Sequence, residues 1–150
     1  MTCQDSNEAA ALREAATRLL ARREHSRREL ARKLVQRGWS EAQAEAEIDA
    51  LAALDLQSDE RFAQGFARQR IEKSYGPRRI QAELAQRGID ESLARRAMAE
   101  HSPDWPGIVA AWYERRWGDS PPADLREKSR RQQALLRRGF THEHFRELFD

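Results

Sequence analysis

One sequence pattern, an amphipathic stretch that ends in Arg-Gly, occurs three times in this chain of 150 residues. The copies superimpose at offsets of 50 and 51 residues and comprise residues 28–40 (RELARKLVQRGWS), 78–90 (RRIQAELAQRGID) and 129–141 (SRRQQALLRRGFT). A regular period of this length is typical of arrays of small helical units. The pattern therefore predicts a tandem helical array.

Each copy combines the end of one helix with the start of the next. Its glycine (Gly38, Gly88 or Gly139) lies just past a helix, where a left-handed backbone costs other residues about 1 kcal/mol or more. The next residue is apolar and packs back on the helix, as in a Schellman motif, and the residue after it is a good N-cap. These pairs are Trp39 and Ser40, Ile89 and Asp90, and Phe140 and Thr141.

Further helix signals divide the chain into units of three helices. Ser26 and Glu29 form a capping box, Pro77 follows Gly76 at a helix start, and residues 118–122 (GDSPP) break a helix. We expect a flexible N-terminal tail at residues 1–8 and three-helix repeats at residues 9–56, 57–101 and 102–150. The predicted fold is all-α, with three tandem three-helix repeats stacked into an elongated, curved array.

Composition supports a helical protein that acts in the cytoplasm. Ala, Glu, Lys, Leu and Arg make up 81 of the 150 residues, whereas two Val and five Ile leave little material for a sheet. The single cysteine, Cys3, excludes an internal disulfide framework. No apolar run approaches the roughly 18 residues of a membrane span, and no signal peptide is evident. We therefore expect a cytoplasmic protein without a membrane partner.

Charge is unevenly distributed along the chain, although the net charge is only +2. Residues 13–37 carry nine basic and three acidic side chains, residues 40–60 carry seven acidic and no basic ones, and residues 61–87 carry seven basic and two acidic ones. This distribution predicts a molecule with a basic and an acidic surface. Each charged run is either a solvated helix face or a binding surface.

The motifs that accompany catalysis are not found. The sequence contains no Walker loop, dinucleotide fingerprint or nucleophile elbow. His142 and His144 are two residues apart, on opposite faces of a helix, whereas a helical zinc site needs histidines four apart. We therefore expect no enzymatic activity, no catalytic residues, no metal site and no cofactor.

The central basic run is the best candidate for a binding site. Tyr75, in the loop before Gly76 and Pro77, either stacks on a base or a protein group, or packs over the turn while the arginines stay in water. Arg37, Arg87 and Arg138 precede the stop glycines, where a cation favours a helix C-terminus. The candidate basic face comprises Arg68, Arg70, Lys73, Tyr75, Arg78, Arg79 and Arg87.

Residues 58–90 (SDERFAQGFARQRIEKSYGPRRIQAELAQRGID) resemble the central signature of RecX, the bacterial regulator of the RecA recombinase. Its Ser-Asp start and its Phe-Ala-x-x-Phe, Gly-Pro-x-Arg-Ile and Glu-Leu-x-x-Arg-Gly-Ile elements occur in order. Residues 22–149 resemble the family more weakly. The resemblance implies three three-helix units that bind the RecA filament on single-stranded DNA along its helical groove and suppress strand exchange and coprotease activity.

An alternative is a helical DNA-binding protein that acts mainly on nucleic acid directly. Both alternatives describe a monomer with a basic face, and both are compatible with weak direct DNA binding. They differ in salt dependence, because phosphate contacts make affinity fall steeply as salt rises.

Overall fold

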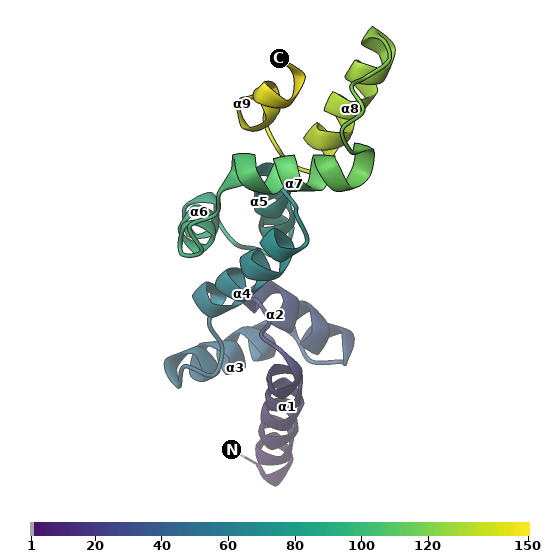
Figure 1. The fold of residues 1–150 in the computed structure, drawn as a ribbon. Coiled ribbons are helices and arrows are strands. Elements are labelled where there is room, and N and C mark those ends of the chain that lie inside the picture. The colour runs from purple at the N-terminus through teal and green to yellow at the C-terminus, as the bar shows by residue number, and fades with distance from the viewer. Residues whose placement is uncertain (1) are drawn as a thin grey trace. The chain divides into compact units, whose positions relative to one another are not determined.

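The computed structural model describes residues 2–150, and every regular element in this range is helical (Figure 1). The elements are α1 (Cys3–Arg22), α2 (Arg27–Gln36), α3 (Glu41–Ala53), α4 (Asp59–Glu72), α5 (Pro77–Gln86), α6 (Glu91–Ala99), α7 (Trp105–Trp117), α8 (Leu125–Arg137), α9 (His142–Phe145) and the 3₁₀ helix η1 (Arg146–Phe149). The all-α prediction is confirmed. None of these helices is long and apolar enough to cross a membrane.

The described residues divide into two compact units. The first unit comprises the chain up to residue 65 together with residues 87–89, and the second comprises residues 66–86 and 90–150. Helix α4 contributes residues to both. The repeat boundaries at residues 9–56, 57–101 and 102–150 stay a prediction.

The N-terminal segment differs from the expected flexible tail, because residues 3–8 belong to α1. Thr2 caps this helix: its hydroxyl accepts a hydrogen bond from the Asp5 amide, and the Asp5 carboxylate accepts one from the Thr2 amide. This capping box satisfies amide groups that a helix start leaves without partners. Met1 lies outside the described residues.

The predicted helix stops are present in all three repeats. Gly38, Gly88 and Gly139 have φ angles of +108°, +85° and +104°. After α2 the Trp39 amide donates to Leu34 O over 3.3 Å, and after α8 the Phe140 amide donates to Leu135 O over 3.1 Å. These bonds are the long-range hydrogen bonds of the Schellman motif and confirm that prediction for the first and third repeats.

The helices that follow the stops begin at the predicted caps. Ser40 and Gln43 form a capping box, and the Asp90 carboxylate accepts a hydrogen bond from the Leu93 amide over 2.8 Å. At Thr141 the arrangement differs, because its amide donates to Nδ1 of His144 over 3.1 Å. A histidine three residues into the helix thus takes the place of the usual glutamate or glutamine.

The first unit has an aliphatic core between α1, α2 and α3. Its buried side chains are Leu12, Ala16, Leu19, Leu30, Leu34, Ala44, Ile48 and Leu51. Charged side chains tie these helices together at the surface: Arg13 pairs with Glu47 over 2.7 Å, and Arg27 pairs with Glu45 over 2.6 Å. The basic run of residues 13–37 is therefore partly neutralised by the acidic run that follows it.

In the second unit, α7, α8 and α9 enclose an aromatic core. Phe140 and Phe145 are fully buried there beside Val109 and Leu135. Arg131 is also buried, and its guanidinium donates to the Tyr113 hydroxyl over 2.8 Å, to Ser120 O over 2.7 Å and to Glu127 over 2.8 Å. These bonds offset much of the cost of removing a charge from water.

A buried histidine closes the α1–α2 connection in the first unit. His25 is 1% exposed; its Nδ1 lies 3.1 Å from Arg23 O and its Nε2 lies 2.9 Å from Lys33 Nζ. Because a lysine ammonium can only donate, Nε2 accepts and Nδ1 carries the proton, so the ring is neutral. Burial lowers the pKa of His25 below its ordinary value.

We predict that alanine costs more at Gly139 than at Gly38. Both glycines have positive φ, but a Cβ at Gly38 has no atom within 4 Å, whereas one at Gly139 would lie 2.5 Å from Arg79 Cβ. Gly38→Ala should reduce the free energy of unfolding by about 1 kcal/mol, and Gly139→Ala by about 3 kcal/mol. Urea denaturation followed by circular dichroism measures both, and equal losses would contradict the contact at Gly139.

We also predict that the protein loses stability on acidification through about pH 6.5, where an unfolded histidine takes up a proton. Since the pKa of folded His25 is lowered, the unfolded state binds more protons, and the free energy of unfolding decreases as the pH falls. Urea midpoints at about pH 7.5 and about pH 5.5 measure the effect. His25→Gln should reduce the pH dependence and leave the part due to His144, whose pKa burial also lowers; an unchanged dependence would refute the assignment to His25.

Candidate binding site around Tyr75

The loop between α4 and α5 turns sharply at a residue other than glycine. Ser74 has a φ angle of +63°, its amide donates to Ile71 O, and the Tyr75 amide donates to Arg70 O over 3.1 Å. This is the same helix stop as in the repeats, with serine in the position of glycine. A left-handed serine is strained, and such strain persists only where surrounding contacts hold it.

The contacts that hold this loop come from the end of α8. The Gly76 amide donates to Arg138 O over 2.9 Å, and the Arg78 amide donates to Gly139 O over 3.1 Å. A Cβ on Gly76 would overlap the backbone carbonyl of Gly139. The Gly76–Pro77 turn is therefore fixed against the helix stop of the third repeat by direct backbone contact.

Arg138 provides the side-chain part of this junction. Its Nε donates to Ser74 O over 2.8 Å and its Nη2 donates to Lys73 O over 2.6 Å. Both carbonyls follow the C-terminal end of α4, where the helix dipole favours a cation. The sequence analysis expects Arg138 to stabilise the end of its own helix, whereas the structure places its guanidinium at the end of another.

Tyr75 lies among these arginines. The guanidinium carbons of Arg138 and Arg79 are 4.2 and 4.4 Å from the centroid of its ring, and that of Arg70 is 6.0 Å away. Arg138 also lies 4.7 Å from the ring of Trp112. The half-buried Tyr75 ring thus packs against guanidinium groups by cation–π contact, and the stacking of a base on it stays a prediction.

Positive charge exceeds negative charge around this ring. Burial opposes ionisation of Glu83, but hydrogen bonds from Arg70 and Arg79 outweigh it and lower the pKa of this carboxyl. Burial lowers the pKa of Arg138, and the charges of Arg79 and Arg115 act in the same direction. We call Arg70, Ser74, Tyr75, Arg79, Arg115 and Arg138 the Tyr75 cluster; within the described part of the chain, Glu83 is the one carboxylate that pairs with it.

The predicted basic face is partly assembled in the structure. Arg70, Tyr75 and Arg79 meet in the Tyr75 cluster, and Lys73 and Arg78 are exposed beside it. Arg68 is exposed on α4 and pairs with Glu72 over 3.2 Å. Arg87 belongs to the first unit, where its Nε lies 3.9 Å from Glu29.

The sequence analysis missed two cations of the cluster. Arg138 occupies the repeat position before a stop glycine, so the repeat contained a signal for it. Arg115 donates to the Ser74 hydroxyl over 3.0 Å, a contact across 41 residues that no local pattern predicts. Within residues 2–150, no group of three or more histidine, cysteine or acidic side chains is arranged to hold a metal ion.

Comparison with protein families gives three matches that follow the repeats. The models of the first, second and third three-helix domains of RecX match residues 13–51, 58–98 and 108–149. The regulatory protein RecX of Halorhodospira halophila is 46% identical over 136 residues, which cover 91% of this chain and 84% of that protein. The RecX protein of Chromohalobacter salexigens is 41% identical over 141 residues, or 94% and 92% of the two chains.

Solved structures show the same fold. The crystal structure of RecX from Lactobacillus salivarius superimposes with a TM-score of 0.75 at 23% identity and covers 93% of this chain and 92% of its own. A second crystal structure, of a regulatory protein RecX, gives a TM-score of 0.78 at 22% identity, covering 94% of this chain and 72% of its own.

We predict that Arg138 contributes strongly to stability. Arg138→Ala removes two charge-assisted hydrogen bonds and two cation–π contacts, and should lower the free energy of unfolding by about 2–4 kcal/mol. Arg37→Ala is the matched control, because Arg37 holds the same position in the first repeat but its exposed side chain bonds to no described residue. Its cost should be under about 0.5 kcal/mol. Urea denaturation compares the two, and similar losses would disprove the role of Arg138.

Proposed function

The chain belongs to the RecX family, and from this membership we propose that it is a negative modulator of the RecA recombinase. It binds RecA filaments on single-stranded DNA along their helical groove and inhibits strand exchange and coprotease activity in DNA repair and the SOS response. It acts by binding and not as an enzyme, without a cofactor, as a monomer in the cytoplasm.

The observation that carries this proposal is the surplus of guanidinium groups in the Tyr75 cluster. The cluster contains four arginines, of which Arg70 and Arg79 pair with Glu83, and backbone hydrogen bonds fix the loop on which they converge. A nucleoprotein filament offers phosphate and carboxylate groups, and guanidinium groups bind both with paired hydrogen bonds. A cluster held in place before binding also loses less entropy when the filament binds.

Within this site the residues have different roles. Arg70, Arg79 and Arg138 support Tyr75, so they position the surface as well as charge it. Lys73, Arg78 and Arg115 are exposed, and no described carboxylate pairs with them. These three supply the first contacts with the filament. Arg68 extends the basic face on the second unit, and Arg87 adds a cation on the first unit.

A second candidate function is direct binding to DNA with the filament effect secondary. The same surplus of cations favours it, because phosphates are the anions of naked DNA as well. The two functions differ in the relative affinity for naked DNA and for filaments. A protein that acts on DNA alone binds naked single strands as tightly as filaments. Its log affinity falls with log salt concentration with a slope of about −0.7 per neutralised phosphate.

We predict that the combined change Lys73→Ala, Arg78→Ala and Arg115→Ala weakens filament binding about 10- to 100-fold. Exposed charged contacts are worth about 0.5–1 kcal/mol each, and three are removed. Fluorescence anisotropy with RecA filaments and with naked single-stranded DNA, each at low and high salt, measures the affinities. Inhibition of strand exchange should weaken in parallel.

The matched control removes the same charge elsewhere through Arg22→Ala, Arg37→Ala and Arg126→Ala, three exposed arginines without a described ion-pair partner. It should bind filaments within about twofold of the parent, because net charge alone acts weakly in salt. If both variants lose affinity equally, the exposed cations Lys73, Arg78 and Arg115 are not the site. If the parent binds naked DNA as tightly as filaments, the second function is the correct one.

A further inference from the structure

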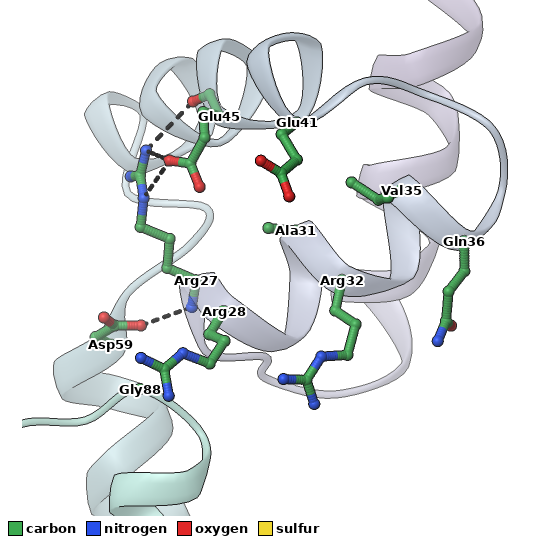
Figure 2. A pocket seen from close by; sticks show the side chains of 10 residues that line it. All are labelled: Arg27, Arg28, Ala31, Arg32, Val35, Gln36, Glu41, Glu45, Asp59 and Gly88. Atoms are coloured by element: carbon green, nitrogen blue, oxygen red, sulfur yellow. Dashed lines mark hydrogen bonds and ion pairs between the residues drawn. The ribbon is translucent and has the colours of Figure 1, made fainter.

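A groove with a volume of about 580 Å³ lies on the first unit between α2 and α3 (Figure 2). Figure 2 shows Ala31 at its centre, with Glu41 and Glu45 of α3 on one side and Arg28 and Arg32 of α2 on the other. Val35 also lines the groove and is 38% exposed. We call it the α2–α3 groove: an aliphatic floor between an acidic row and a basic row.

In each of the two rows, one side chain has no partner among the described residues. Glu45 accepts a hydrogen bond from Arg27 over 2.6 Å, which orients its carboxylate on the groove wall. The side chains of Arg32 and Glu41, in contrast, form no hydrogen bond or ion pair with any other residue that the structure describes, and both are exposed. A cation and an anion are thus available on opposite sides of the groove (Figure 2).

The internal repeat shows that folding does not require these residues. At the repeat offset, the second repeat has Ala82, Ala85 and Arg95 where the first has Arg32, Val35 and Glu45. Helix α5 nevertheless packs on α6, as α2 packs on α3. The same pair of helices forms without the valine and with one residue of each row, Arg78 and Glu91, so the presence of Arg32, Val35 and Glu45 in the first repeat needs another explanation.

We propose that the α2–α3 groove binds a peptide segment of the partner protein. The segment places an aliphatic side chain on Ala31 and Val35, an acidic residue toward Arg28 and Arg32, and a basic residue toward Glu41 and Glu45. Nucleic acid does not fit, because Glu41 and Glu45 would face its phosphates. This inference rests on the proposed function, in which the partner is RecA. The groove binds a segment of the RecA polypeptide, whereas the Tyr75 cluster binds anionic groups of the filament.

Two variants test the groove. Arg32→Ala with Val35→Ala installs the residues of the second repeat, which are compatible with this fold. Arg32→Glu with Glu41→Arg exchanges one charge of each row and keeps the net charge of the protein. The matched control, Arg22→Ala with Leu54→Ala, removes an exposed arginine and a leucine that is 60% exposed and does not line the groove.

Affinity is measured for RecA filaments on single-stranded DNA and for naked single-stranded DNA, after circular dichroism and melting curves have compared each variant with the parent. Both groove variants should bind filaments at least about tenfold more weakly, because hot-spot contacts in an interface are individually worth this much. Their affinity for naked DNA should stay within about twofold of the parent. The control should match the parent in both assays.

Groove variants that bind filaments as tightly as the parent would overturn the proposal. So would an equal loss of affinity for filaments and naked DNA, since the groove would then belong to a nucleic-acid surface. Failure of the proposed function looks different: the parent itself would not bind filaments more tightly than naked DNA, and the groove would be left without its partner.

Discussion

The turn after the second helix of each repeat is the constraint on which the rest of the structure depends. The chain must reverse direction there and still bring its next apolar side chain back to the core, and a glycine with positive φ allows both. In the third repeat the turn brings Phe140 to full burial. The absence of a side chain on Gly139 also leaves room for Arg79 and Gly76 to pack against it.

Much of the fold could be predicted because its determinants are local. The glycine stops, the caps at Ser40 and Asp90 and the proline at the start of α5 each depend on residues within one or two helical turns. The capping box of Thr2 was equally local, yet residues 1–8 were expected to form a flexible tail. The first helix starts within that segment, at Cys3.

The candidate site could be predicted only in part, for the opposite reason. Arg70, Tyr75 and Arg79 are close in sequence, and their clustering follows from the loop between α4 and α5. Arg138 bonds to backbone 64 and 65 residues away, and its role depends on how the third repeat packs on that loop. Buried Arg131 was unpredictable in the same way, since its partners Tyr113 and Ser120 come from other elements.

The two units carry surfaces of different chemistry. The Tyr75 cluster has four arginines and one carboxylate, whereas the α2–α3 groove has acidic and basic rows about an aliphatic floor. The first arrangement attracts any polyanion, and the second discriminates by the order of charges along a ligand. One chain can thus combine a general electrostatic attraction with a contact that depends on sequence.

The contact between Gly76 and Gly139 limits how this sequence can change. In a core of side chains, a larger residue at one position can be accommodated by a smaller one opposite, so substitutions can occur as compensating pairs. A Cβ on Gly76 would meet the backbone of Gly139 and Phe140, and backbone cannot become smaller. No second substitution can therefore rescue a first, and only a shift of the main chain could relieve it. The glycine at position 76 is therefore fixed by the backbone that it faces and not by any side chain around it.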